Sequence, residues 1–329
     1  MAELAGLRPR AAWFSYLGAL GGCLDYLGVE ASPTWLAGGT GTAFIMNMQA
    51  NADVASPIAW DGLCVNPCRP TNPGLVMRLG GNVGYAVRAV CGCPHGQARE
   101  LDEKREQAWD LVRESIDQGL PCLGFELAHP EFFTISGYTD EGYLFIMAGD
   151  DGAPDTVAGP KPWRELGAEI GWVRVEAVSV GDPAPDEVVV REALRSVSAT
   201  MTQPPGPGEF ILGLVGYDMW AKALHHGTAD RFGHRYNAAC WAELRTHAAA
   251  FLRETKERLP GRADGLLEEA AGHYQAVADK LQAARALHPF LDAAGEHLQS
   301  DEAAGLVQEA GASESQGFPL LGRIADALA

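Results

Sequence analysis

The sequence is poor in positive charge. Its 329 residues hold 25 Lys and Arg against 43 Asp and Glu, which gives a formal net charge of −18. A protein that binds nucleic acid must follow a phosphate backbone with positive side chains, and this chain would have to do so against its own repulsive field. The charge balance therefore argues against nucleic acid as a partner.

Long apolar runs are also missing. No stretch approaches the roughly 20 apolar residues that a membrane-spanning helix requires. The opening residues, MAELAGLRPRAAW, lack the charged start, apolar middle and small-residue cleavage site of a secretory signal. We therefore expect a cytoplasmic protein with no membrane partner. The hydrophobic content of 47% is enough to bury a large core, in one large domain or two closely packed ones.

Cysteine is sparse, and its count of seven is odd. This is unlike a small secreted disulfide scaffold, so most of the cysteines are expected to be free thiols. The segments CVNPC and CGCPH together offer enough ligands for a tetrahedral zinc site. Their C-x3-C and C-x-C spacings differ from the paired C-x2-C of common zinc ribbons, so loop or packing thiols are the favoured interpretation. The residues concerned are Cys64, Cys68, Cys91, Cys93 and His95.

The segment 11–29, AAWFSYLGALGGCLDYLGV, contains a single charged side chain, Asp25. Its apolar spacing predicts a helix from about Ser15 to Leu27 that neighbouring elements approach closely on all sides. Four small residues, three of them glycines, line one side of this helix. A glycine costs about 1 kcal/mol relative to alanine inside a helix, so tight burial is expected to compensate. The sequence therefore predicts a central helix.

The rest of the first half alternates between loops, strands and one amphipathic helix. The segment 100–121 has an apolar face and ends at Gly119 and Pro121, which is typical of a helix terminus. Strand patterns follow it and read as an antiparallel meander. GGTGTAF lacks the Lys and Ser/Thr of a phosphate-binding loop, so no cofactor is predicted. The predicted strands are 84–90, 122–127, 131–138, 142–147 and 169–180, with a loop at 159–163.

From about residue 186 the composition changes to Ala, Leu, Glu and Arg, which favours helices. This change predicts a first domain over 1–185 and a helical region over 186–329. The polar segment 300–317 is expected to be a mobile connection. The histidines 225, 226 and 234 are expected at exposed helix ends. Helices are predicted over 187–202, 209–226, 237–258 and 262–287.

Four segments in a fixed order carry a resemblance to a known family. They are YLGALGGCLDYLGV, GTGTAF, WDLVRESIDQGLPCLGFEL and FFTISGYTDEGYLFI, and they span about residues 13 to 150. In their order and spacing they resemble the family named for the N-terminal domain of butirosin biosynthesis protein H, within the papain-like C39 peptidase group. GLVGYDMWAKAL is similar to the helical region that often follows this domain. The resemblance implies an α+β, papain-like core with a buried central helix and an antiparallel sheet.

The resemblance also implies where a site would lie. Members of the wider group cleave peptides or transfer an acyl group from a carrier-protein thioester to an amine, using a cysteine at the start of the central helix and a histidine. Here the position of the cysteine is taken by Ser15 and that of the histidine by Glu131. The third partner falls near Asp150 or Asp151. The usual Cys/His pair is therefore not retained, and proteolysis is not expected.

Each of these residues has alternatives that the sequence leaves open. Ser15 is either a nucleophile, or a helix N-cap or an ordinary helix residue, since serine is among the best capping residues. Glu131 would serve as a base only if burial raised its pKa above the reference value of roughly 4.3. His129, two residues earlier, is a second candidate base. Otherwise Glu131 is an exposed or ion-paired carboxylate at the end of a strand, and His129 is a loop residue. Cys23 is the fallback nucleophile, although a thiol in mid-helix loses the help of the helix dipole.

Two functions from different classes follow. The first is an enzyme for acyl-transfer or amide-bond chemistry on a small-molecule or carrier-protein-linked substrate, in which Ser15, Glu131, His129 and Asp150 form the site. The second is a non-catalytic descendant that uses the same cleft for binding or serves as a scaffold. The sequence does not predict an oligomeric state.

Overall fold

The structure is a computed structural model, and it describes residues 1–49, 75–92, 98–147, 155–202, 210–288 and 296–329. The chain divides into two compact units. Among the described residues, the first unit holds 1–33 and 83–183, and the second holds 34–49, 75–82 and 184–329. The division after Pro183 lies close to the boundary predicted at 185. The segments 34–49 and 75–82, which were predicted in the first domain, group with the second unit instead.

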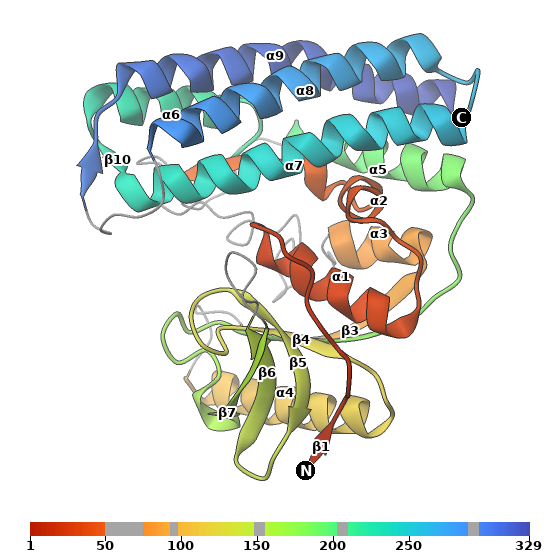
Figure 1. Cartoon of the computed structure of the whole chain (residues 1–329), viewed down its shortest axis with the longest axis vertical. Coiled ribbons are helices and arrows are strands. Elements are labelled where there is room, and N and C mark those ends of the chain that lie inside the picture. Colours follow the sequence, from red (N-terminus) through yellow and green to blue (C-terminus); the bar gives the residue numbers. More distant parts are fainter. Residues whose placement is uncertain (50–74, 93–97, 148–154, 203–209, 289–295) are drawn as a thin grey trace. The chain divides into compact units, whose positions relative to one another are not determined.

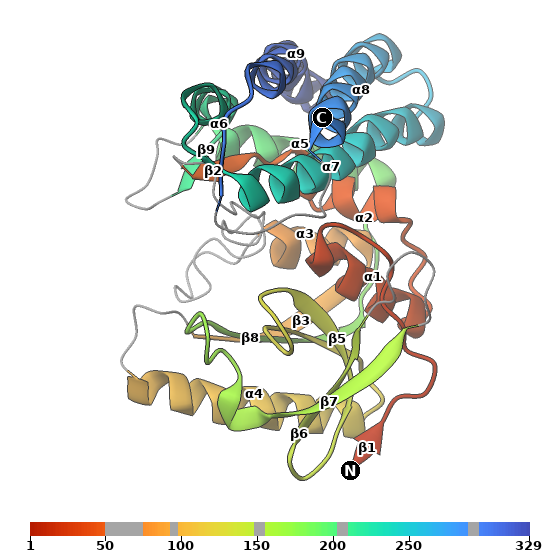
Figure 2. The same cartoon turned by 60° about the vertical axis from the view of Figure 1, so that its left-hand side comes forward.

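The first unit is an α+β domain built on an antiparallel sheet (Figures 1 and 2). Its strand order is β3-β8-β4-β5-β6-β7. In addition, β1 pairs antiparallel with the C-terminal end of β5. The predicted meander is confirmed as β4, β5 and β6. The segment 159–163, predicted as a loop, lies largely in β7, an edge strand where proline is tolerated. The strands are β1 (Ala2–Glu3), β3 (Tyr85–Gly92), β4 (Cys122–Phe125), β5 (Phe132–Tyr138), β6 (Gly142–Met147), β7 (Thr156–Pro162) and β8 (Val173–Val180).

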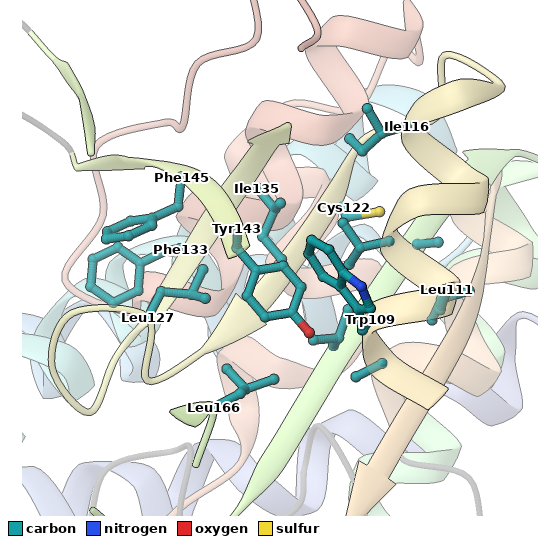
Figure 3. Close-up of a cluster of buried hydrophobic side chains, with 14 of the residues drawn as sticks. Trp109, Leu111, Ile116, Cys122, Leu127, Phe133, Ile135, Tyr143, Phe145 and Leu166 are labelled. Carbon is teal, nitrogen blue, oxygen red and sulfur yellow. The ribbon is translucent and has the colours of Figure 1, made fainter. Parts of the chain in front are cut away.

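Two helices cover the opposite faces of this sheet, α1 (Ser15–Leu27) and α4 (Ala98–Asp117) (Figure 2). Side chains alternate along each strand, so one set faces each helix. The set that faces α4 forms a hydrophobic core in which Trp109 packs edge-on against Tyr143, with ring centroids 5.2 Å apart (Figure 3). The core also contains Leu111, Ile116, Cys122, Leu127, Phe133, Ile135, Phe145 and Leu166.

The glycines of α1 are explained by the chain segment that precedes the helix. The amide of Arg10 donates to the carbonyl of Gly18 over 2.9 Å, so residues 8–10 run directly along the helix backbone. A Cβ on Gly22 would lie 2.0 Å from the carbonyl oxygen of Arg8. Arg10 also forms an ion pair with the exposed carboxylate of Asp25 and holds the pKa of that carboxyl below its usual value. As predicted, α1 is buried, with nine consecutive buried residues from Tyr16 onward.

The second unit is mainly helical. Within it, α8 packs against α7 and α9, and α9 also packs against α5 and α6 (Figure 1). Short strands β2 (Asn47–Gln49) and β9 (Phe210–Leu212) pair antiparallel, as do β10 (Ala229–Asp230) and β11 (His297–Leu298). The helices are α2 (Pro33–Gly39), α3 (Leu75–Val83), α5 (Asp186–Met201), α6 (Val215–His226), α7 (Arg231–Arg258), α8 (Asp264–Leu287) and α9 (Asp301–Ala327).

The prediction of a mobile connection over 300–317 is wrong, because this segment forms most of α9. Ser300 caps the helix by accepting a hydrogen bond from the amide of Ala303 over 3.2 Å. Despite the polarity of the segment, several of its residues are buried, among them Ala310, Gly311 and Glu314. Of the helices in the described ranges, none is long and apolar enough to cross a membrane.

Candidate functional site

Ser15 is the first residue of α1. The N-cap position is occupied by Phe14, which makes no side-chain capping hydrogen bond. The interpretation of Ser15 as an N-cap is therefore wrong, and its hydroxyl bonds to groups outside its own helix. The side chain is half-buried, so it retains access to solvent.

The structure brings Ser15 and Glu131 together. The Ser15 hydroxyl donates a hydrogen bond to Oε2 of Glu131. The Ser15 hydroxyl oxygen also accepts a hydrogen bond from the backbone amide of Phe132 over 3.1 Å. The start of α1 is thus joined to the start of β5 by two hydrogen bonds that share one hydroxyl. Glu131 is half-buried like Ser15, so the pair lies at the boundary of the core.

Glu131 is presented by the loop that joins β4 to β5. This loop closes through two backbone bonds: the amide of Glu126 donates to the carbonyl of Glu131 over 2.9 Å, and the amide of Glu131 donates to the carbonyl of His129 over 2.7 Å. His129 itself is exposed, and its ring packs edge-on against Phe133 with centroids 4.9 Å apart. Of the two candidate bases, only Glu131 contacts Ser15.

Cys23 lies in a different environment from Ser15. Its side chain is fully buried, and its thiol donates to the carbonyl of Cys122 with a sulfur–oxygen distance of 3.6 Å. Burial, followed by the nearby Cys122 and Glu176, raises the pKa of the Cys23 thiol well above its usual value. A nucleophilic cysteine requires a thiolate, so this environment opposes the fallback role. Asp150 and Asp151 lie outside the described residues.

A buried charge network of Tyr16, Arg174 and Glu176 lies next to Ser15, and the sequence analysis did not predict it. The Tyr16 hydroxyl donates to Oε2 of Glu176 over 2.8 Å, and Nε of Arg174 donates to Oε1 of the same carboxylate over 2.6 Å. All three side chains are fully buried. Burial, reinforced by Glu176, raises the pKa of Tyr16 well above its usual value. The Tyr16–Glu176 hydrogen bond joins the first turn of α1, which carries Ser15, to β8.

Aromatic rings fill the space between the first turn of α1 and the sheet. Tyr16 packs edge-on against Phe132 at 4.9 Å, and Phe125 packs against Phe132 at 5.2 Å, measured between ring centroids. Trp172 lies 4.7 Å from Phe125 and 6.2 Å from Phe132. These contacts surround the Ser15 side of β5 with rigid apolar groups, which restricts how the site can rearrange.

Four of the five proposed zinc ligands lie outside the described residues: Cys64, Cys68, Cys93 and His95. Cys91 is described: it lies half-buried in β3, with Nη1 of Arg174 3.6 Å from its sulfur. Within the part of the chain that the structure describes, no group of three His, Cys, Asp or Glu side chains is arranged to hold a metal ion.

The start of α1 places a helix N-terminus next to the Ser15 hydroxyl. The amides of Ser15 and Tyr16 are the first of the helix, where amides have no acceptor within the helix. By contrast, the amides of Leu17 and Gly18 donate to the carbonyl of Phe14. Amides at the positive end of a helix that have no acceptor within the helix are suited to stabilise an oxyanion. The carboxylate of Glu131 is placed to take the hydroxyl proton of Ser15.

Comparison with protein-family models finds no match, and comparison with curated proteins finds none either. The geometry described above is therefore the basis for assigning a function.

Proposed function

We propose that the first unit is a papain-like domain that transfers acyl groups, with Ser15 as nucleophile and Glu131 as general base. The observation that carries this proposal is the hydrogen bond from the Ser15 hydroxyl to the Glu131 carboxylate. It is supported by the place of Ser15 at the start of a buried helix and by the sheet strand that begins directly after Glu131. No metal or cofactor takes part in this chemistry.

The proposed reaction has two steps. In the first, the Ser15 oxygen attacks the carbonyl carbon of an acyl thioester, its proton passes to Glu131, and the carbon–sulfur bond breaks as the leaving thiolate takes that proton. This step leaves an ester on Ser15 and releases a thiol. In the second, an amine attacks the ester and loses one proton, the Ser15 oxygen leaves and is reprotonated, and the product is an amide. Atoms and charges balance without an external oxidant or reductant.

A thioester suits this site better than a peptide does. A serine hydroxyl needs a close base, and a carboxylate is a weaker base than an imidazole at neutral pH. The electrophile must therefore be more reactive than an amide. A thioester is such an electrophile, because its thiolate is a good leaving group. The proposed activity is thus that of an acyltransferase whose acyl donor is a small-molecule or carrier-linked thioester.

The test is acylation by short-chain acyl thioesters of N-acetylcysteamine, followed by intact-protein mass spectrometry. The wild type and Cys23→Ser are expected to gain one acyl group, and Ser15→Ala none. Ser198→Ala is the matched control, because the Ser198 hydroxyl donates to a carbonyl of its own helix. Equal acylation of all four proteins, or acylation of none, would contradict the proposal.

One observation favours a non-catalytic function instead. The Ser15 oxygen accepts the amide of Phe132, so its hydroxyl is also a structural link between α1 and β5. If that link is its whole role, Ser15→Ala costs about 1–2 kcal/mol of stability because a buried amide loses its partner. The wild type would then gain no acyl group from the thioester, and the site would be a binding cleft or scaffold.

A further inference from the structure

Glu126 has an unusual backbone conformation. Among the described residues it is the one non-glycine residue with positive φ, at 61°. A side chain in this region costs of order 1–3 kcal/mol and persists when the surroundings hold it in place. Glu126 is also almost fully buried, with 1% of its surface exposed. A strained backbone and a buried carboxylate at the same residue need a physical explanation.

Backbone amides surround the carboxylate of Glu126. Oε1 accepts the amide of Glu169 over 2.8 Å, and Oε2 accepts the amide of Ile170 over 3.2 Å. Two consecutive amides that bind one anion form a nest, which favours a negative charge. The carboxylate therefore fastens the β4–β5 loop to the turn at residues 167–171.

Glu126 also bonds to the C-terminal end of the β4–β5 loop. The amide of Glu126 donates to the carbonyl of Glu131, so Glu126 fixes the backbone of the residue that contacts Ser15. Trp172, which follows the turn, contacts Phe125 and Phe132, the residues that flank the loop. Segment 167–172 thus contacts both ends of the loop. Its amides bind the Glu126 carboxylate near the start of the loop, and the Trp172 ring packs against Phe125 before the loop and Phe132 after it.

We propose that Glu126 is the positioning residue that holds Glu131 against Ser15. Its carboxylate fills the nest, the filled nest fixes the loop, and the fixed loop aims the Glu131 side chain at the Ser15 hydroxyl. The role in catalysis rests on the acyltransferase function proposed above. The positioning itself is a property of the fold and can be measured without that activity.

Two variants separate the backbone from the carboxylate. Glu126→Gly tolerates the positive φ but empties the nest. Glu126→Gln retains the shape of the side chain and removes its charge. Glu141→Gln is the matched control, since Glu141 is an exposed carboxylate in the neighbouring β5–β6 turn. Formate is the probe for the empty nest, because it is a carboxylate small enough to replace the one removed.

The first readout is hydrogen exchange of the Phe132 amide by NMR, because this amide bonds to Ser15. Exchange at Phe132 is expected to be at least about ten-fold faster in both Glu126 variants than in the wild type and in Glu141→Gln, with the amide of Ile135 in mid-strand unchanged. Formate is expected to restore slow exchange in Glu126→Gly and not in Glu126→Gln. A role in general stability alone would speed both amides equally and would not respond to formate.

The second readout is the rate of Ser15 acylation in the same proteins, expected to fall at least about ten-fold and to recover with formate in Glu126→Gly. Unchanged Phe132 exchange in both variants would overturn the positioning role. If exchange responds as expected while the wild type itself is never acylated, the positioning role stands and the acyltransferase function fails.

Discussion

Ser15, at the start of α1, donates its hydroxyl hydrogen to Glu131, which lies 116 residues later at the start of β5. This bond joins the central helix to the sheet at the one place where the helix amides have no partner within the helix. The pair consists of a hydroxyl and a carboxyl group, at the two positions where the sequence resemblance predicts a thiol and an imidazole. Its chemistry can be probed by exchanging these groups.

Replacing the pair by cysteine and histidine is expected to introduce a reactive thiol at the start of α1. In Ser15→Cys alone, the helix start lowers the pKa of the new thiol while the Glu131 carboxylate raises it. In Ser15→Cys with Glu131→His, an imidazolium replaces the carboxylate and also favours the thiolate. We expect the double variant to react with iodoacetamide at pH 6 at least about ten-fold faster than the single one, with the wild type as background. Equal rates would show that residue 131 does not act on residue 15.

Adding one methyl group to Gly22 is expected to destabilise the first unit. A Cβ there would lie 2.0 Å from the Arg8 carbonyl, so the 8–10 segment must move. We expect Gly22→Ala to cost about 1–3 kcal/mol in urea unfolding. The matched control is Gly265→Ala, where nothing lies within 4 Å of the added Cβ and alanine is the better helix former. Equal stability of Gly22→Ala and Gly265→Ala would show that residues 8–10 do not lie against the backbone of α1.

The helical unit contains a fully buried ion pair whose partners are expected to be strongly coupled. Nε and Nη2 of Arg245 donate to the two oxygens of Glu314, each over 2.8 Å, and Nη1 donates to the carbonyls of Ala43 and Ile45. Glu314→Gln leaves a buried guanidinium without its counter-charge, so a loss of about 3–5 kcal/mol is expected. A double-mutant cycle with Arg245→Met measures the coupling.

The exposed pair of Lys256 and Glu268, whose nitrogen and oxygen lie 2.7 Å apart, is the control for this cycle. Water screens its charges, so no measurable coupling is expected there. A coupling between Arg245 and Glu314 as small as that of the exposed pair would contradict the arrangement.

His234 is expected to make the protein less stable in acid. Trp220 donates to Nδ1 of His234 over 3.0 Å, and burial, followed by the nearby His288 and Arg235, lowers the pKa of His234 to about 3. The unfolded chain binds this proton near pH 6.5, so the contribution of His234 is complete above that pH and is lost as the pH falls toward 3. The expected slope is about 1.4 kcal/mol per pH unit below 6.5.

The measurement is urea unfolding at pH 7, 5 and 4. His234→Asn keeps an acceptor for Trp220 but cannot take up a proton in this range, so its stability is expected to vary less with pH. His226→Asn, at an exposed position, is expected to behave like the wild type. Identical pH profiles for all three proteins would show that His234 is not held neutral.

The burial of α1 and the strand meander followed from local patterns, because small residues at helical spacing and alternating apolar residues report burial directly. His234 shows what such patterns miss. It was expected at an exposed helix end, yet it is buried against Trp220, and its burial depends on how separate helices pack. Glu314 lies in the segment expected to be mobile, and its partner is 69 residues earlier in the chain. No local pattern contains that information.

The candidate site was partly predictable for a similar reason. The positions of Ser15 and Glu131 came from the order of motifs, and the structure places the two in contact. Arg174 and Glu176 were missed, although two opposite charges two residues apart in the apolar strand VRVEAV lie on one face of the sheet and were a usable signal. No local sequence pattern pointed to Glu126, because the amides that bind its carboxylate come from a turn 43 residues later in the chain.

Proton transfer from Ser15 to Glu131 is tested by the rate of acylation at Ser15 itself, measured by peptide mapping after exposure to an acyl thioester. If Glu131 takes the proton from Ser15, Glu131→Gln is expected to slow the reaction by about 10²–10⁴-fold, while Glu141→Gln leaves it unchanged. An acyl group found on another residue, or an equal rate in Glu131→Gln and the wild type, would contradict the account.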